Sequence, residues 1–199
     1  MKKWILALLI FILSLDIIEA QCLGAQSYTL NPLGPYSPGQ TVTVTYTLSN
    51  FIQVNINWIH CFDLDLGAGW SSVTPISGPG NPGGSSGSWI WDNQHTYPSG
   101  INFGPGWRFS NTGVPQWGTS STGPFTMSFQ LTVDSSCTPQ NLDINMEVYG
   151  DCQTGGWSNG ACCAIVPYSI YSGTSSGSIG LAGLDNTINS CDSDSAFNM

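Results

Sequence analysis

The chain has 199 residues, of which 3 are basic and 12 are acidic, and its net charge at pH 7 is −9. Three lysine and arginine side chains are too few to neutralise a phosphate backbone. The composition therefore excludes nucleic acid as a partner and disfavours binding to anionic membrane surfaces. With 41% hydrophobic residues and 8 tryptophans, the chain can bury a real core, which disordered acidic chains lack.

The first 20 residues have the pattern of a secretory signal peptide. Two lysines precede an apolar run over residues 4–15, and Ala20 is a small residue at the expected cleavage point. The run is short for a membrane anchor, which needs about 20 apolar residues. A lipoprotein signal before Cys22 is an alternative, but Gln21 is a poor residue for it. We therefore expect a mature protein that is secreted or at the cell surface, with no membrane insertion.

Strict alternation of apolar and polar residues predicts long strands. In the clearest one, residues 41–49, Val42, Val44, Tyr46 and Leu48 alternate with threonines and a serine. Other long strands are expected at 56–66, 125–133 and 142–149, and shorter ones at 28–30, 73–77, 88–92, 101–103, 107–110 and 164–171. Strands that are apolar on one face belong to antiparallel sheets. Residues 21–171 are thus predicted to form an all-β antiparallel β-sandwich of Ig-like or jelly-roll type, with about eight strands and long Gly/Pro/Ser loops.

The alternation also predicts which side chains share the core. Val42, Trp58, Phe129 and Ile144 come from the four long strands and should point into one interior. His60 follows Trp58 by two residues and so falls on the same apolar face. We expect it to be a buried, hydrogen-bonded histidine rather than a catalytic base.

Seven cysteines in an exported chain indicate disulfide bonds. Setting aside Cys191 in the C-terminal tail leaves six candidates, which are Cys22, Cys61, Cys137, Cys152, Cys162 and Cys163. The best local pairing joins Cys152 to Cys162 or Cys163, and the remaining connectivity stays open. A zinc site is an alternative, but paired CxxC spacing is missing and the chain has only 2 histidines.

The composition changes after Tyr171. Residues 172–180 are a Gly/Ser-rich stretch typical of a flexible linker. Residues 181–199 contain no strand of useful length, and we interpret them as the start of a following module that is cut short.

Short motifs at turns and strand starts link the chain to a family. They are PGQTV at 38–42, then YTLSN, NWIH and GAGW, then FGPGW at 103–107 and GDCQTGGWSNGAC at 150–162. Over residues 26–199 the chain resembles a β-sandwich module of large exported Bacteroidota-type surface proteins, which often carry gliding-motility-associated or type IX sorting domains. The resemblance implies a cell-surface location and other modules of the same chain as partners. It offers no catalytic residues, and no sorting domain is present, so the chain is a fragment or is exported by another route.

Two aspartates form a candidate metal site. Asp63 and Asp65 lie on the wet face of one strand, about 7 Å apart, and with a loop carbonyl such a pair can share calcium. Two solvated surface acids are the competing interpretation. No other cofactor is indicated.

The distance between two carboxylates along a strand also argues against a glycosidase. Asp143 and Glu147 are about 13 Å apart along one strand, whereas an inverting glycosidase pair is at most about 9.5 Å apart. No serine stands in a GxSxG context. We therefore predict no catalytic residues, and a secreted glycan-acting enzyme remains the least favoured alternative.

Four tryptophans next to glycines are the candidate binding residues: Trp70, Trp107, Trp117 and Trp157. Aromatic faces in loops stack on sugars or fill a partner's pocket, whereas the competing interpretation is that these rings cap the core. The favoured function is a non-catalytic structural or adhesion module of a surface protein, with a surface glycan or protein as ligand. A carbohydrate-binding module that uses the loop tryptophans is the alternative.

Overall fold

The computed structural model describes residues 22–52, 57–96, 102–136, 138–151, 153–154 and 167–175. The expected signal peptide, residues 176–180 of the expected linker and the truncated module lie outside these ranges. Residues 172–175 of the linker are described, and the Ser175 N–H donates a hydrogen bond of 2.9 Å to the Gln140 carbonyl. Within them, no helix is long and apolar enough to span a membrane.

Strands make up nearly all of the regular structure in the described residues. They are β1 (Gln26–Asn31), β2 (Thr41–Leu48), β3 (Ile59–Leu66), β4 (Trp70–Ser77), β5 (Gly87–Asp92), β6 (His95–Thr96), β7 (Asn102–Phe103), β8 (Gly106–Asn111), β9 (Phe125–Val133), β10 (Ile144–Gly150) and β11 (Tyr168–Tyr171). The sequence located most of them to within a few residues. It missed β6, whose two residues are too few to show alternation.

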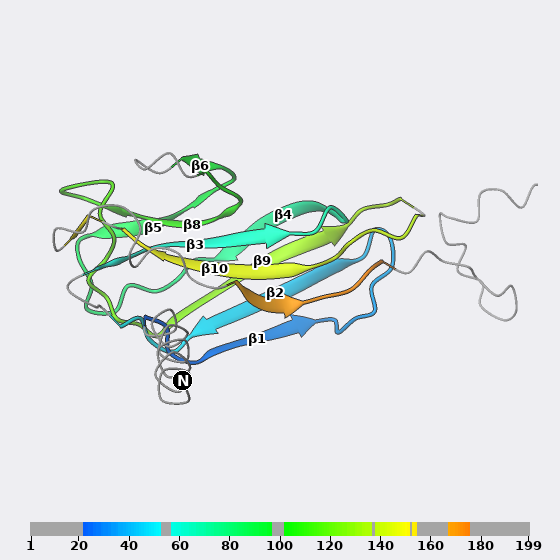
Figure 1. Cartoon of the computed structure of the whole chain (residues 1–199), viewed down its shortest axis with the longest axis horizontal. Coiled ribbons are helices and arrows are strands. Elements are labelled where there is room, and N and C mark those ends of the chain that lie inside the picture. The colour runs from blue at the N-terminus through cyan, green and yellow to red at the C-terminus, as the bar shows by residue number, and fades with distance from the viewer. Residues whose placement is uncertain are drawn as a thin grey trace, which may run out of the picture.

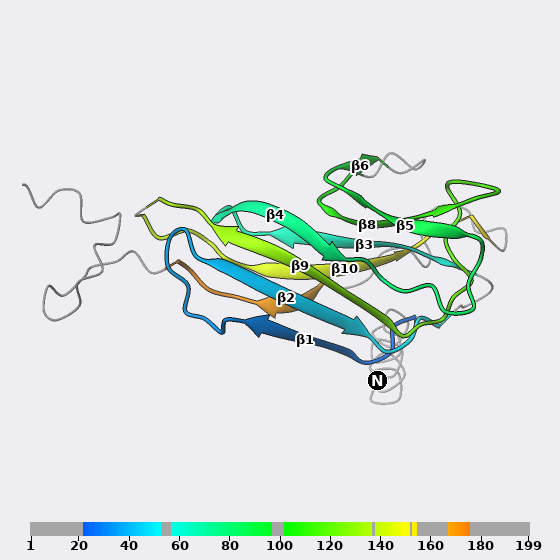
Figure 2. The ribbon, with the colours of Figure 1, turned by 180° about the vertical axis from the view of Figure 1, so that it is seen from behind.

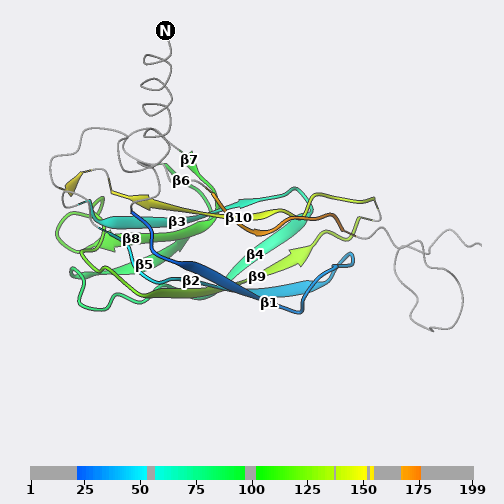
Figure 3. The ribbon, with the colours of Figure 1, turned by 60° about the horizontal axis from the view of Figure 1, so that its bottom comes forward.

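Two antiparallel sheets pack face to face and confirm the predicted all-β sandwich. One has the strand order β1-β2-β9-β4 and the other β11-β10-β3-β8-β5 (Figure 1). Figure 3 shows β3 and β10 in the layer above β1 and β2. A small ribbon of β6 and β7 stands apart from both sheets and connects β5 to β8.

The core lies between the sheets, where the alternating apolar residues of both layers meet. Val42, Phe129 and Ile144 are all fully buried in one hydrophobic cluster, as the alternation predicted. Tyr46 and Phe62 join the two layers with ring centroids 6.2 Å apart. Burial of such alternating rows is the main driving force for this fold.

Trp58 and His60 do not lie on the predicted core face, because β3 contains a β-bulge, whereas the predicted burial of His60 is confirmed. Tyr149 of β10 pairs with Cys61, but the next residue, Gly150, pairs with Ile59. His60 is therefore an extra residue that shifts the alternation by one. Ile59 enters the core, His60 is buried outside it, and Trp58 before the strand is only half-buried.

Candidate functional site

The outer face of the four-stranded sheet is covered by uncharged polar side chains, and we call it the hydroxyl face. Residues directly opposite one another in a ladder share a face, so the register defines this surface. Its fourteen paired positions are Ser27, Thr29, Asn31, Thr41, Thr43, Thr45, Thr47, Ser72, Thr74, Ser77, Thr126, Ser128, Gln130 and Thr132. None of them carries a charge, in a chain whose net charge is −9.

The hydroxyls of this face contact one another across strands. Thr47 and Thr126 are hydrogen-bonded at 3.1 Å, and Ser77 and Ser128 at 2.6 Å. The β1–β2 and β2–β9 ladders keep an unbroken register, so their outward residues form regular rows. Figure 2 shows these strands from the side opposite to Figure 1. At the β4 edge, two irregularities in the β4–β9 register leave Ser71 and the exposed Ile76 as extra residues beside the hydroxyl face.

The outer face of the five-stranded sheet is different, because it gathers titratable groups. We call this set the polar cluster: Cys61 and Asp63 of β3, Glu147 and Tyr149 of β10, Arg108 of β8 and Asp92 of β5. Tyr149, Cys61 and Arg108 form one cross-strand row. In the next row, Glu147 faces Asp63, while Gly106 separates Asp63 from Asp92.

Asp63 is the most perturbed carboxyl of the cluster. It is 6% exposed, its Oδ2 accepts a hydrogen bond of 3.2 Å from the Gly104 backbone N–H, and its buried Oδ1 has no hydrogen-bond partner. Burial, with a smaller contribution from the nearby Glu147 carboxylate, raises the pKa of Asp63 to about 7. Glu147 in turn accepts a hydrogen bond from the Tyr149 hydroxyl.

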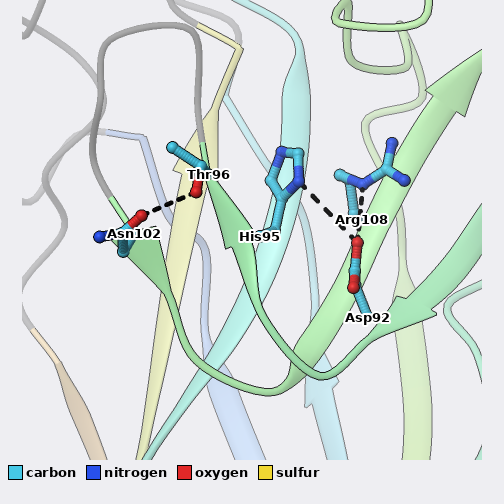
Figure 4. Close-up of polar contacts among 5 residues, drawn as sticks. All are labelled: Asp92, His95, Thr96, Asn102 and Arg108. Carbon is cyan, nitrogen blue, oxygen red and sulfur yellow. Dashed lines mark hydrogen bonds and ion pairs between the residues drawn. The ribbon is translucent and has the colours of Figure 1, made fainter.

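Asp92 and Arg108 of the polar cluster meet His95 where the β6–β7 ribbon begins. The Asp92 Oδ2 atom is 3.6 Å from Arg108 Nε and 3.9 Å from His95 Nδ1, and both side chains point toward it in Figure 4. The ribbon itself is closed by a Thr96–Asn102 hydrogen bond of 2.8 Å. The His60 ring lies 6.2 Å from that of His95. Burial lowers the pKa of His60 to about 3, so it is neutral at physiological pH.

The structure separates the two aspartates that the sequence offered for calcium. Asp65 is exposed and accepts a hydrogen bond from Asn145 Nδ2 at 3.2 Å, whereas Asp63 is buried beneath Gly104. No group of three or more His, Cys, Asp or Glu side chains in the described ranges is placed to hold a metal ion. The partner of Asp63 across the sheet is Glu147, which strand spacing alone did not reveal.

Of the predicted disulfide residues, two lie in the described ranges. Cys61 is a free thiol in this structure and is 3% exposed. The β-bulge keeps this thiol on the outer face beside Tyr149, and burial raises its pKa. Cys22 is half-buried near the start of β1. Cys137, Cys152, Cys162, Cys163 and Cys191 lie outside the described residues.

The candidate tryptophans do not form one site. Trp70 and Trp107 pack against the core, which supports the capping interpretation for both. Trp117 is half-buried and meets Trp58 edge-to-face, with ring centroids 5.9 Å apart. Trp157 lies outside the described residues. The Trp58–Trp117 pair is therefore the arrangement closest to the expected aromatic platform.

A buried carboxylate positions that pair. Asp151 is fully buried, and its two oxygens accept hydrogen bonds from the backbone N–H groups of Gly118, Gln153 and Thr154 and from the Thr154 hydroxyl. The Thr154 hydroxyl also accepts a bond of 3.0 Å from the Trp58 N–H. The loops that carry Trp58 and Trp117 are thus held by one side chain.

The sequence alone did not predict the polar cluster or the hydrogen bonds of Asp151. Arg108 and Asp151 were not singled out, although a single base after residue 3 and an aspartate directly after a predicted strand were visible signals. The comparisons supply no further guide, since no protein-family model, curated protein or solved structure matches the chain. The resemblance to Bacteroidota-type surface modules accordingly stays a prediction.

Proposed function

We propose that this chain is an exported, non-catalytic adhesion module of a multidomain surface protein, and that the hydroxyl face is its contact surface. The observation that supports the proposal is the complete lack of charge at the fourteen paired positions of that face. The acidic side chains of the described sandwich lie elsewhere, several of them in the polar cluster on the opposite sheet.

The chemistry of the face favours an uncharged, hydroxyl-rich ligand such as a neutral glycan. Threonine and serine hydroxyls both donate and accept hydrogen bonds. Threonine is also stiff at χ1, so rows such as Thr43, Thr45 and Thr47 lose little side-chain freedom on binding. Many weak contacts over a broad face are typical of adhesion to a polymer, where repeated engagement raises the overall affinity.

The test compares the binding of neutral polysaccharides by the wild-type chain and by a variant that carries a charge in the middle of the hydroxyl face. Thr45→Glu introduces an unpaired carboxylate among hydroxyls and is expected to lower binding at least tenfold. Ser88→Glu is the matched control, because Ser88 is exposed on the other sheet. Equal binding by both variants, with unchanged thermal stability, contradicts a role for the hydroxyl face.

A second candidate rests on the half-buried Trp58–Trp117 pair. Aromatic rings at the loop end of a sandwich suit a carbohydrate-binding module. Under this alternative, Trp117→Ala abolishes glycan binding while Thr45→Glu leaves it intact. Hydrolysis of a glycan that is lost on changing one carboxylate would instead assign the chain to glycan-acting enzymes.

A further inference from the structure

The two main sheets end in edge strands, which are β1 and β4 in one sheet and β5 and β11 in the other. An edge strand presents a row of unpaired backbone N–H and C=O groups, which can pair with a strand of another molecule. Within the described residues β5 pairs with β8 alone, so every second residue of β5 directs these groups away from the sheet. The protection of each edge therefore indicates where a partner can add.

Three of these edges carry features that oppose pairing. The β4 strand contains Pro75 and two irregularities in its register with β9. The β11 strand has only 4 residues. The start of β1 is covered by Tyr168, whose hydroxyl donates a hydrogen bond of 3.3 Å to the Gln26 carbonyl and whose ring meets that of Tyr28 edge-to-face.

The β5 edge has no such protection. Its 6 residues pair with β8 in an unbroken register and include neither proline nor lysine. Trp89 and Trp91 pack against the core, so Ile90 between them points outward, where it is 41% exposed. A regular edge with an exposed apolar side chain is suited to the addition of another strand.

The distribution of charge favours a second copy of this chain as the partner. Two copies with a net charge of −9 repel each other, so they can approach closely only where charge is absent. Residues 66–91, which include β4 and most of β5, contain no charged side chain. Asp92 is the one charged residue of β5, and Arg108 Nε lies 3.6 Å from its carboxylate.

We propose that β5 pairs antiparallel with β5 of a second copy, about a two-fold axis at Ile90. In this register Ile90 lies opposite Ile90 of the other copy, Trp89 opposite Trp91, and Ser88 opposite Asp92. Residues that lie opposite each other share a face, so the exposed isoleucines cover each other. The Ser88 hydroxyl donates to the Asp92 carboxylate of the other copy, and no like charges meet. Such a contact is isologous, as a closed dimer requires.

The dimer also has a consequence for adhesion, which rests on the proposed function. Because the paired residues of the two β5 strands point to the same side, the two-fold axis is perpendicular to the joined sheet. The two hydroxyl faces therefore point in one direction. A dimer can then engage one glycan polymer through both faces, which raises the overall affinity.

The mass of the full secreted chain in solution, measured by light scattering over a range of concentrations, tests the dimer. The wild type should reach twice the mass of one chain. Ile90→Lys places two like charges at the axis and should weaken the dimer by at least about tenfold. Leu33→Lys is the matched control, because Leu33 is also an exposed apolar residue but lies outside β5, and it should dimerise as the wild type does.

Cysteine cross-linking tests the register. In Ile90→Cys the two introduced thiols meet at the axis, within reach of a disulfide. In Ser88→Cys, on the same face of the same strand, they lie about 13 Å apart. Compared with the wild type, oxidation should therefore add a covalent dimer in Ile90→Cys and none in Ser88→Cys.

Three results overturn the proposal: a wild type that stays monomeric at every concentration, a dimer that Ile90→Lys leaves intact, or cross-linking of Ser88→Cys in preference to Ile90→Cys. Glycan binding is tested separately, by comparing Thr45→Glu with Ser88→Glu in the Ile90→Lys background, where both are expected to be monomers. Failure of the dimer is thereby distinguished from failure of the hydroxyl face.

Discussion

Asp63 on β3 lies directly opposite Glu147 on β10, so two carboxyl groups occupy one rung of an antiparallel ladder. Like charges in this arrangement are destabilising. The fold reduces the conflict by burying Asp63, which favours its neutral form, and by giving Glu147 the Tyr149 hydroxyl as a donor. Asp63 is therefore a buried carboxyl group of near-neutral pKa on the outer side of the five-stranded sheet.

The pH dependence of stability should show two opposing contributions. Asp63 has a pKa of about 7 in the fold against 3.8 in the unfolded chain, so its stabilising contribution is complete below about pH 4 and is lost as the pH rises through 7. His60 has a pKa of about 3 against 6.5, so its contribution is complete above pH 6.5 and is lost as the pH falls towards 3. Between about pH 4 and 6.5 the two slopes oppose each other.

We therefore expect the free energy of unfolding of the wild type to be nearly flat in this range. In Asp63→Asn it should rise with pH, by at most about 1.4 kcal/mol per pH unit. In His60→Gln it should fall with pH to the same extent. Urea unfolding followed by tryptophan fluorescence measures all three. Parallel curves for the three proteins would show that neither group is buried as described.

The β-bulge in β3 depends on Gly150. A Cβ at this position would lie 2.2 Å from the side-chain nitrogen of Asn57, which is fully buried. Gly150→Ala should therefore cost about 1–3 kcal/mol of stability, as overpacking does elsewhere. Gly80→Ala is the control, because the nearest atom to its new Cβ is Pro82 Cδ at 3.7 Å. Equal midpoints of denaturation for the two variants would contradict the bulge geometry.

The sequence predicts the features that one strand sets alone, but not those that depend on which residues of two strands pair. Alternation was enough to place Val42, Phe129 and Ile144 in the core, because period two is a property of each strand alone. It assigned Trp58 and His60 to the wrong face, although His60 is buried as predicted, since a bulge arises from the pairing of two strands and leaves no local mark. The sequence placed Asp63 and Glu147 on two separate predicted strands, but their opposition required the β3–β10 register.

The two classes of tryptophan should respond differently to truncation. Trp107 packs against the core and its ring closely approaches Gly78, so Trp107→Ala should cost about 2–3 kcal/mol of stability. Trp117 is half-buried and its main contact is the edge-to-face pair with Trp58, so Trp117→Ala should cost about 1 kcal/mol. Thermal denaturation measures both losses. A larger loss for Trp117 than for Trp107 would reverse their structural assignment.

Asp151 should be the most sensitive carboxylate of the loop end. It is fully buried and uses both oxygens to accept four hydrogen bonds, including one of 2.9 Å from the Gly118 N–H. In Asp151→Asn the amide NH₂ must face at least one of these donors, which leaves a buried N–H without an acceptor. The expected cost is about 2–3 kcal/mol.

Asp134→Asn is the matched control, because among the described residues Asp134 accepts one bond of this kind, at 2.7 Å from the Ser136 N–H, in a half-buried position. The two variants differ in a second observable. Since Asp151 holds the loops of Trp58 and Trp117, its substitution should also shift tryptophan fluorescence towards solvent-exposed values, whereas Asp134→Asn should not. If Asp151→Asn loses stability without that shift, the carboxylate supports the fold but does not position the aromatic pair.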